Sequence, residues 1–139
     1  MLNNIHVDFL GSGISSVDTA EGILIGRPYG GLAILWRKTL SKSVKVVNMK
    51  DNRLLSCVIS PADNQRQSVH LLNVYLPYEC DSNYDDYVNY LGKLTTYVED
   101  NSSDIVYIIG DFNANLYPHD HGDNTSLFGS ELVHMCEDF

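Results

Sequence analysis

The most informative part of the sequence runs from Ile105 to Asn113 and reads Ile-Val-Tyr-Ile-Ile-Gly-Asp-Phe-Asn. Its first five residues form a continuous apolar run of strand length, which predicts a strand buried on both faces. Ligand sites often gather where such a strand ends, because the sheet holds the residues that follow it rigidly. Asp111 and Asn113 are therefore candidate site residues.

The Asp-Phe-Asn segment after this strand allows two interpretations. If the chain stays extended, Asp111 and Asn113 point to the same side and offer a carboxylate and an amide to one phosphate or water. A carboxylate there can orient or deprotonate an attacking water, and an amide can hold a phosphate oxygen without charge repulsion. The alternative is an Asx-turn, in which the aspartate side chain only caps the end of the strand.

Upstream of this strand, the spacing of apolar runs predicts an antiparallel meander followed by a helix. The runs at 32–36, 44–49, 54–59 and 69–75 are separated by turn residues, with a tight hairpin at 50–53. Helical periodicity between Asp81 and Asp100 predicts a helix capped by Asp81 or Ser82. Its apolar face comprises Tyr84, Tyr87, Val88, Leu91, Leu94 and Val98.

The two ends of the chain carry weaker signals. Residues 1–26 contain an apolar patch at 7–10, a predicted Gly/Ser-rich loop at 11–16 and a brief apolar run at 22–25. A polar loop at 118–125 leads to a second predicted helix, one side of which is lined by Leu127, Phe128, Leu132, Met135 and Cys136. No repeat or linker interrupts the chain, so we expect a mixed α/β fold in one domain, residues 1–139.

A second candidate constellation lies at the end of the run at 69–75. Period-2 alternation places Asn73 and Tyr75 on the same face of the strand, and Pro77 ends it because proline cannot donate to the ladder. A tyrosine hydroxyl can bond a phosphate oxygen or a catalytic carboxylate. The alternative for Tyr75 is an ordinary half-buried tyrosine.

Charge is distributed unevenly along the chain, although the net charge is −9. Residues 27–66 hold eight of the nine Lys and Arg against two acids, a balance of +6, whereas residues 67–139 hold thirteen acids against one lysine, a balance of −12. This asymmetry suits a basic edge for phosphate contacts beside an acidic region for a divalent cation. A solvated hairpin surface explains the basic segment equally well.

Composition narrows the class of protein. The three cysteines, Cys57, Cys80 and Cys136, have no Cys-x-x-Cys spacing, which argues against a disulfide framework or zinc site and for reduced thiols in an intracellular protein. No apolar run approaches the length of a membrane span, and the N-terminus does not resemble a secretory signal. We therefore expect no membrane partner, and nuclear access if DNA is the substrate.

Taken in order, three motifs resemble the endonuclease/exonuclease/phosphatase family. They are Gly30-Gly31-Leu32-Ala33-Ile34-Leu35-Trp36, Asn73-Val74-Tyr75-Leu76-Pro77 and Ile108-Ile109-Gly110-Asp111-Phe112-Asn113-Ala114. Arg27-Pro28-Tyr29 before the first motif, and Arg37-Lys38 after it, look most like the endonucleases of LINE-type retrotransposons. The resemblance covers residues 22–139, and the Gly-Asp-Phe-Asn-Ala element is its most specific part.

The resemblance implies a four-layer α/β sandwich with mainly antiparallel sheets that hydrolyses phosphodiesters with Mg²⁺ or Mn²⁺. Tyr75 would correspond to the tyrosine near the scissile phosphate, and Asp111 to the carboxylate that activates the water and meets the metal. Asn113 would contact the phosphate, and Asn73 would support the site. Arg37 and Lys38 would bind the substrate, which for the retrotransposon branch is DNA.

The sequence also departs from the family pattern at both ends. The family places a metal-binding Glu and an Asn well before the Gly-Gly strand, but the neighbours of Glu21 do not match that motif, and no Ser-Asp-His element follows the second helix. We therefore expect an incomplete sandwich with exposed sheet edges open to pairing, and impaired or absent activity. His119-Asp120-His121 is a candidate replacement that binds metal or shuttles protons, or simply an exposed polar loop.

Two functions remain open from the sequence. One is a DNA-nicking phosphodiesterase module, and the other is a non-catalytic module that binds nucleic acid or protein through its basic hairpins. A small-molecule phosphatase of the same family has less support, because the Trp36-Arg37-Lys38 context resembles the retrotransposon branch.

Overall fold

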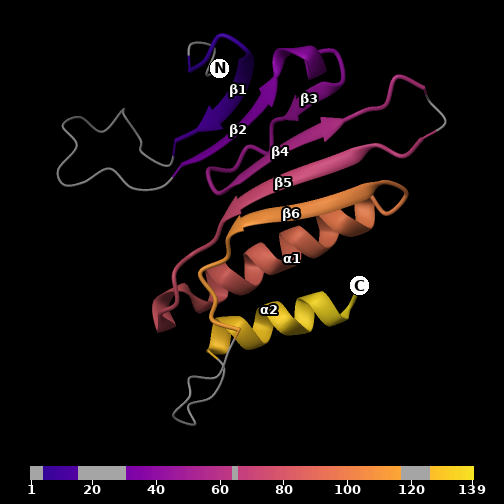
Figure 1. Ribbon diagram of the computed structural model, residues 1–139. Coiled ribbons are helices and arrows are strands. Elements are labelled where there is room, and N and C mark those ends of the chain that lie inside the picture. Colours follow the sequence, from indigo (N-terminus) through magenta and orange to yellow (C-terminus); the bar gives the residue numbers. More distant parts are fainter. Residues whose placement is uncertain (1–4, 16–30, 64–65, 117–125) are drawn as a thin grey trace. The chain divides into compact units, whose positions relative to one another are not determined.

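The structure, a computed structural model, describes residues 5–15, 31–63, 66–116 and 126–139 (Figure 1). These residues form two sheets and two α-helices, which confirms the predicted mixed α/β class. The chain divides into two compact units. We call Met1–Tyr75 with Ser103–Gly110 the sheet unit, and Leu76–Ser102 with Asp111–Phe139 the helix unit.

The first sheet of the sheet unit has two strands. β1 (Phe9–Ile14) pairs antiparallel with β2 (Leu32–Arg37), with Gly11 opposite Leu35 and Gly13 opposite Ala33. The predicted loop at 11–16 is therefore wrong for residues 11–14. Glycine has low intrinsic strand propensity, but the ladder to β2 supplies its backbone with partners and overrides that preference. The apolar run at 22–25 lies outside the described residues.

The second sheet has the order β3-β4-β5-β6 (Figure 1). Its strands are β3 (Val44–Val47), β4 (Leu54–Ile59), β5 (Val69–Tyr75) and β6 (Ile105–Asp111). Antiparallel pairing of β3 with β4 and of β4 with β5 confirms the later part of the predicted meander. Its first part is wrong, because β2 pairs with β1 and a short 3-10 helix, η2 (Lys38–Leu40), separates it from β3.

β5 and β6 run parallel. At the start of both strands Ile105 N–H donates to the carbonyl of Ser68 at 3.0 Å, and at their far end Leu76 N–H donates to the carbonyl of Asp111 at 2.9 Å. Parallel neighbours require a crossover connection, which here contains the helix predicted between Asp81 and Asp100. The chain therefore combines a hairpin meander with one crossover.

The core of the sheet unit lies between its two sheets. Leu32 and Ile34 of β2 and Leu55 and Cys57 of β4 form a buried cluster. Half-buried side chains from β1, β2, β3 and β5 pack against it: Ile14, Trp36, Val44, Leu71 and Tyr75. Burial raises the pKa of the Cys57 thiol, because the thiolate would lose its hydration. This sheet-on-sheet packing holds the end of β5 in place.

The helix unit contains η3 (Asp81–Asn83), α1 (Tyr84–Asp100) and α2 (Leu127–Glu137). Of the predicted α1 face, Tyr87, Leu91 and Leu94 are buried, whereas Val88 is exposed. The predicted cap is wrong, because the N-cap is Asn83 and no side chain caps the first turn. Among the described residues, neither helix has the length and apolar character needed to cross a membrane.

α2 packs on α1 through aromatic rings. The rings of Tyr87 and Phe128 stack with centroids 4.0 Å apart, and Leu132 is buried on the same helix as Phe128. The predicted apolar side of α2 is wrong for Leu127, which is 54% exposed, and for Cys136, which is also exposed. The apolar stripe of α2 is thus narrower than its composition indicates.

The predicted burial of β6 on both faces is wrong. Ile105, Tyr107 and Ile109 are 40%, 55% and 44% exposed, while Val106 and Ile108 are half-buried. A continuous apolar run cannot distinguish a central strand from a strand at the end of a sheet, because burial depends on neighbours that the run does not contain. Here β6 is the last strand in the described order.

Candidate functional site

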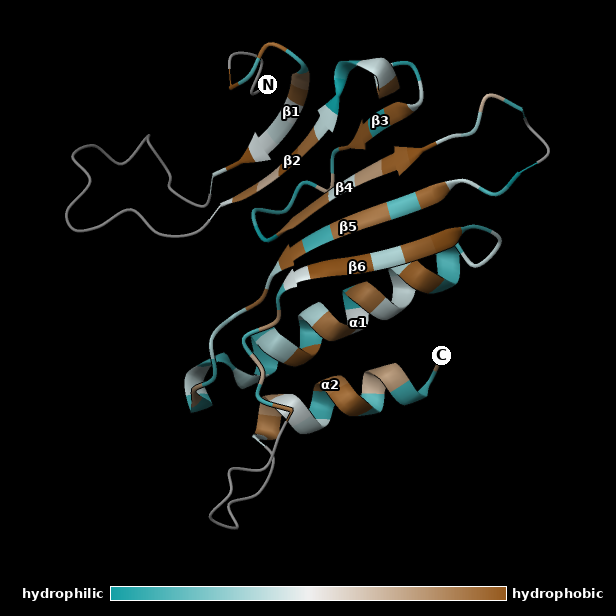
Figure 2. Ribbon diagram, viewed as in Figure 1, coloured by the Kyte–Doolittle hydropathy of each residue, from teal (hydrophilic) through white to brown (hydrophobic). Residues whose placement is uncertain are grey.

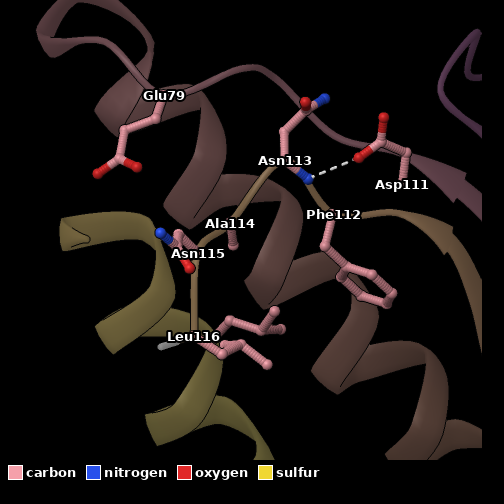
Figure 3. A pocket seen from close by; sticks show the side chains of 8 residues that line it. Glu79, Asp111, Phe112, Asn113, Ala114, Asn115 and Leu116 are labelled. Atoms are coloured by element: carbon pink, nitrogen blue, oxygen red, sulfur yellow. Dashed lines mark hydrogen bonds between the residues drawn. The ribbon is translucent and has the colours of Figure 1, made fainter. Parts of the chain in front are cut away.

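Residues 111–116, which begin with Asp111 of the Gly-Asp-Phe-Asn-Ala element, line a hollow of about 520 Å³ in the helix unit (Figure 3). The hollow combines two carboxylates, two amides and an apolar wall. Its lining residues are Glu79, Asp111, Phe112, Asn113, Ala114, Asn115, Leu116 and Leu132. Polar groups that converge in a concave pocket are the usual basis for a ligand site.

The next-to-last residue of β6, Gly110, has to be glycine. Gly110 has φ +133°, and a Cβ at this position would lie 2.0 Å from the carbonyl oxygen of Val74 on the neighbouring strand. No side chain fits at that distance, and L-residues rarely adopt such a φ. Gly110 thereby lets β6 approach β5 closely and turn into the segment that starts with Asp111.

The Asp111 side chain forms an Asx-turn (Figure 3). Its Oδ1 accepts a hydrogen bond from the backbone N–H of Asn113 at 3.0 Å, and Asn113 has φ +49°. The condition that the chain stays extended through Asn113 is therefore wrong, since left-handed backbone breaks the two-residue alternation. Asn is one of the few residues that tolerate this conformation. Asp111 itself remains exposed.

The Asn113 amide is tied to the chain that follows β5. Its Nδ2 donates to the carbonyl of Leu76 at 2.8 Å, and Leu76 N–H donates to the carbonyl of Asp111. These two bonds fasten the segment 111–113 to Leu76 on both sides. An amide that contacts phosphate from here would have to donate the second hydrogen of Nδ2 or give up this bond, because the amide oxygen only accepts.

The rest of the hollow is fastened to the start of α2. Ser126 is the N-cap: its Oγ accepts from Gly129 N–H at 2.9 Å and also bonds the backbone N–H and carbonyl of Asn115 at 3.2 Å. A Cβ on Gly129 would lie 2.1 Å from the carbonyl oxygen of Asn115. Glu79 Oε1 accepts from Phe128 N–H at 3.4 Å. Asn115 is thus held to the start of α2 through Ser126, and Glu79 is held there through Phe128.

The sequence did not indicate two of the polar groups in this hollow. Glu79 and Asn115 carry no local signal, because only the tertiary fold brings them beside Asp111 and Asn113. Ser126 could have been found, since a serine directly before an apolar helical run is a typical N-cap.

Asn73 and Tyr75 lie on one face of β5, as predicted. Leu72 and Val74 between and beside them are fully buried on the other face. Asn73 Nδ2 donates to the carbonyl of Ala33 on β2 at 3.2 Å, which links the two sheets. Asn73 therefore supports the architecture of the sheet unit directly.

Tyr75 is held by Arg53. Its backbone N–H donates to the Arg53 carbonyl at 3.0 Å, its carbonyl accepts from Arg53 Nη1 at 3.1 Å, and the guanidinium carbon lies 5.6 Å from the ring centroid. Tyr75 belongs to the sheet unit, whereas Asp111 and Asn113 belong to the helix unit. Their predicted convergence on one phosphate stays a prediction.

Arg37 ends β2, Lys38 begins η2, and both are exposed. The Arg37 guanidinium carbon is 5.8 Å from the ring centroid of Phe9, and Lys38 N–H donates to the carbonyl of Asp8 at 2.9 Å. Lys42 and Lys45 follow, also exposed, with no acid between positions 37 and 45. We call Arg37, Lys38, Lys42 and Lys45 the basic segment; its side chains are available for phosphate contacts.

The hollow offers oxygen ligands of the kind that Mg²⁺ prefers, from Asp111 and Glu79. Mg²⁺ usually keeps several waters and is bound through one or two carboxylates together with substrate phosphate. Within the described residues no group of three or more His, Cys, Asp or Glu is placed to hold a metal. Binding of a cation jointly by these carboxylates and substrate stays a prediction. His119-Asp120-His121 lies outside the described residues.

No model of a protein family matches this chain, and no curated protein matches it either. The case for a function therefore rests on the residues themselves.

Proposed function

We propose that this chain is a phosphodiesterase module of the endonuclease/exonuclease/phosphatase type, related to the endonucleases of LINE-type retrotransposons. The partners that we propose are DNA, with Mg²⁺ or Mn²⁺, and another chain that pairs with an exposed sheet edge. The observation that carries the proposal is the exposed Asp111 carboxylate at the end of β6, in a hollow shared with Glu79 and two amides. The ordered motifs around Tyr75 and Asp111 support it.

Asp111 would align and deprotonate a water whose oxygen attacks the phosphorus atom. The new P–O bond forms as the bond to the leaving sugar oxygen breaks, and the water proton passes to the Asp111 carboxylate. The amide of Asn113 would hydrogen-bond a non-bridging phosphate oxygen, where charge develops. When bound by Asp111 and Glu79, Mg²⁺ would polarise the phosphoryl oxygen and stabilise the leaving oxygen.

We expect this activity to be weak. Two acids line the hollow among the residues that the structure describes, and the Asn113 Nδ2 group donates to the carbonyl of Leu76. Loss of one group that acts in the transition state commonly lowers the rate by about a hundredfold or more. Nicking of DNA by the chain would therefore be slow and would need comparison with a variant that lacks the carboxylate.

The decisive variant is Asp111→Asn. An asparagine side chain still offers Oδ1 to Asn113 N–H, so the Asx-turn is kept while the negative charge is lost. Supercoiled DNA is incubated with Mg²⁺ and each variant, and conversion to the nicked form is measured. We expect Asp111→Asn to lose nicking by about a hundredfold, with Glu99→Gln as the charge-matched control on the exposed surface of α1. Equal nicking by both variants would refute the catalytic assignment.

Asn113→Gly is the second variant. Glycine accepts φ +49° without strain, so this substitution deletes the amide and leaves the backbone path allowed. We expect slower nicking by Asn113→Gly with an unchanged circular dichroism spectrum. An unchanged nicking rate would remove Asn113 from the proposed mechanism.

The alternative function is nucleic-acid binding without cleavage. Two observations favour it: the basic segment is exposed, and the Asp111 and Asn113 side chains already make internal bonds. Binding to duplex DNA is measured against salt concentration. Combined Arg37→Ala and Lys38→Ala substitutions should lower affinity and reduce the salt slope by about two, if each contacts a phosphate. Lys93→Ala, on α1, is the control. Binding with no nicking above the Asp111→Asn background supports this alternative.

A further inference from the structure

The outer edge of β6 is one of the open strand edges of the sheet unit among the described residues. β6 is the last strand in the order β3-β4-β5-β6, and among the residues that the structure describes no strand pairs with its other side. A strand edge presents a row of N–H and C=O groups that matches another strand. The partner that fits the unpaired backbone groups of this edge is therefore another β-strand.

The register of β5 and β6 identifies which residues face that edge. Ile105 N–H bonds to Ser68, so in the parallel pattern Ile105, Tyr107 and Ile109 direct their backbone groups toward β5. Val106 and Ile108 then direct theirs toward the open edge. An incoming strand would exchange its hydrogen bonds with these two residues.

The side chains of β6 lack the devices that usually protect an edge. The run from Ile105 to Ile109 contains no charge and no proline, and Figure 2 shows β6 hydrophobic over most of its length. Ile105, Tyr107 and Ile109 form an exposed apolar row. At the opposite end of the sheet, β3 is shorter and carries the exposed Lys45, a typical protection against pairing.

We propose that two copies of this chain pair antiparallel through β6, with the twofold axis at Tyr107. This register places Val106 opposite Ile108, so that both residues exchange N–H and C=O groups with the partner. Tyr107 then faces Tyr107 of the second copy, and Ile105 faces Ile109. Asp104 falls opposite Gly110, so no two carboxylates oppose each other. The exposed apolar rows of both copies join into one.

The second copy is favoured as occupant because the strand is complementary to itself. A homotypic interface with twofold symmetry uses the same patch on both partners, and this patch has no charge that would repel its own copy. One pair of short strands buries less than the roughly 1,200 Å² of a standard stable interface. The dimer is therefore reversible and depends on protein concentration.

Sedimentation of the full chain tests the association. We expect a monomer–dimer equilibrium whose dimer fraction rises with concentration. Tyr107→Lys would place two ammonium groups face to face and should weaken the dimer by at least about tenfold. Because Tyr107 is exposed, the circular dichroism spectrum should not change. A wild-type chain that stays monomeric throughout, or a dimer that Tyr107→Lys leaves intact, would overturn the proposal.

Cross-linking tests the register, and does so even if Tyr107→Lys fails to fold. In a chain carrying Cys80→Ser and Cys136→Ser, Tyr107→Cys would bring two thiols into a directly opposed, non-hydrogen-bonded pair, a separation suited to a disulfide. Ile105→Cys would face Ile109 instead. We expect oxidation to give a covalent dimer with Tyr107→Cys and none with Ile105→Cys. Equal cross-linking by both variants would refute this register. The inference rests on the partner part of the proposed function, a chain that pairs with a sheet edge, and not on its catalytic part, so Asp111→Asn should leave the dimer unchanged even where it abolishes nicking.

Discussion

Replacing Tyr87 with phenylalanine should stabilise the helix unit, by an amount that grows at high pH. The Tyr87 hydroxyl is buried and has no hydrogen-bond partner among the described residues. Leaving a buried polar group unsatisfied costs about 1–3 kcal/mol. Phenylalanine keeps the ring that stacks on Phe128, so Tyr87→Phe should raise the free energy of unfolding by about 1 kcal/mol near neutral pH.

The pH dependence follows from the Tyr87 pKa. Burial, with smaller contributions from Glu79 and Cys136, raises this pKa from 10.0 to about 12. The folded state therefore holds the phenol proton more tightly than the unfolded state. The wild type keeps its full free energy of unfolding below pH 10 and loses part of it as pH rises toward 12, because the unfolded state ionises first. At about pH 11 the wild type loses about 1.4 kcal/mol that the variant keeps, so the difference between them grows to about 2.4 kcal/mol.

Urea unfolding at both pH values measures this difference. Both α-helices of the described part of the chain belong to the helix unit, so far-ultraviolet circular dichroism reports mainly on that unit. Trp36, the single tryptophan, reports on the sheet unit by fluorescence. Tyr78→Phe is the control, because Tyr78 is 66% exposed. A Tyr87→Phe variant less stable than wild type at neutral pH would show that the hydroxyl has a partner; a difference independent of pH would contradict the raised pKa.

Three further predictions concern backbone space, thiol burial and the link between the sheets. Gly110→Ala should destabilise the sheet unit by at least about 3 kcal/mol, because of its φ and the nearby Val74 carbonyl. Gly92→Ala, with open space around it in α1, should stabilise the helix unit by up to about 1 kcal/mol. Urea unfolding compares the two variants, and equal effects would contradict the close approach of Gly110 to Val74. A thiol reagent should modify exposed Cys136 first and buried Cys57 only on unfolding, which peptide mass mapping checks; rapid native labelling of Cys57 would count against its burial. Asn73→Ala should cost about 1 kcal/mol by removing the bond to Ala33, read from Trp36 fluorescence, and an unchanged midpoint would show that the bond is not needed.

The elements that the sequence predicted well are those whose signal is local. α1 carries a regular apolar spacing, and β4 and β5 are apolar runs bounded by turn residues, so their ends agree with the structure closely. Tyr87, Leu91 and Leu94 are buried because helical geometry places them on one face. Periodicity suffices wherever one element contains all of the information.

The errors occur where the outcome depends on a distant segment. β1 contains two glycines and forms a strand only because β2 pairs with it. The exposure of β6 depends on which strand lies beside it, and the same five apolar residues would suit a central position. At Asn113 the Asx-turn interpretation is confirmed, and the part that depends on a distant segment is the bond to Leu76. In each case the contacting segment lies elsewhere in the chain, so the local sequence does not indicate it.

The Asx-turn at Asp111 does not by itself argue against catalysis. An ionised carboxylate has about four lone-pair sites on two oxygens, and the bond from Asn113 N–H occupies one of them. That bond fixes the orientation of the group, and catalytic side chains work best when neighbouring hydrogen bonds hold them in place. The structural and catalytic roles therefore differ in one property, the negative charge, because an asparagine can form the turn but cannot accept a proton from water. For this reason Asp111→Asn should be as stable as the wild type, while Asp111→Ala should be less stable. Asp111 acts in the chemistry only if both variants lose nicking, because both lack the negative charge although only one loses stability.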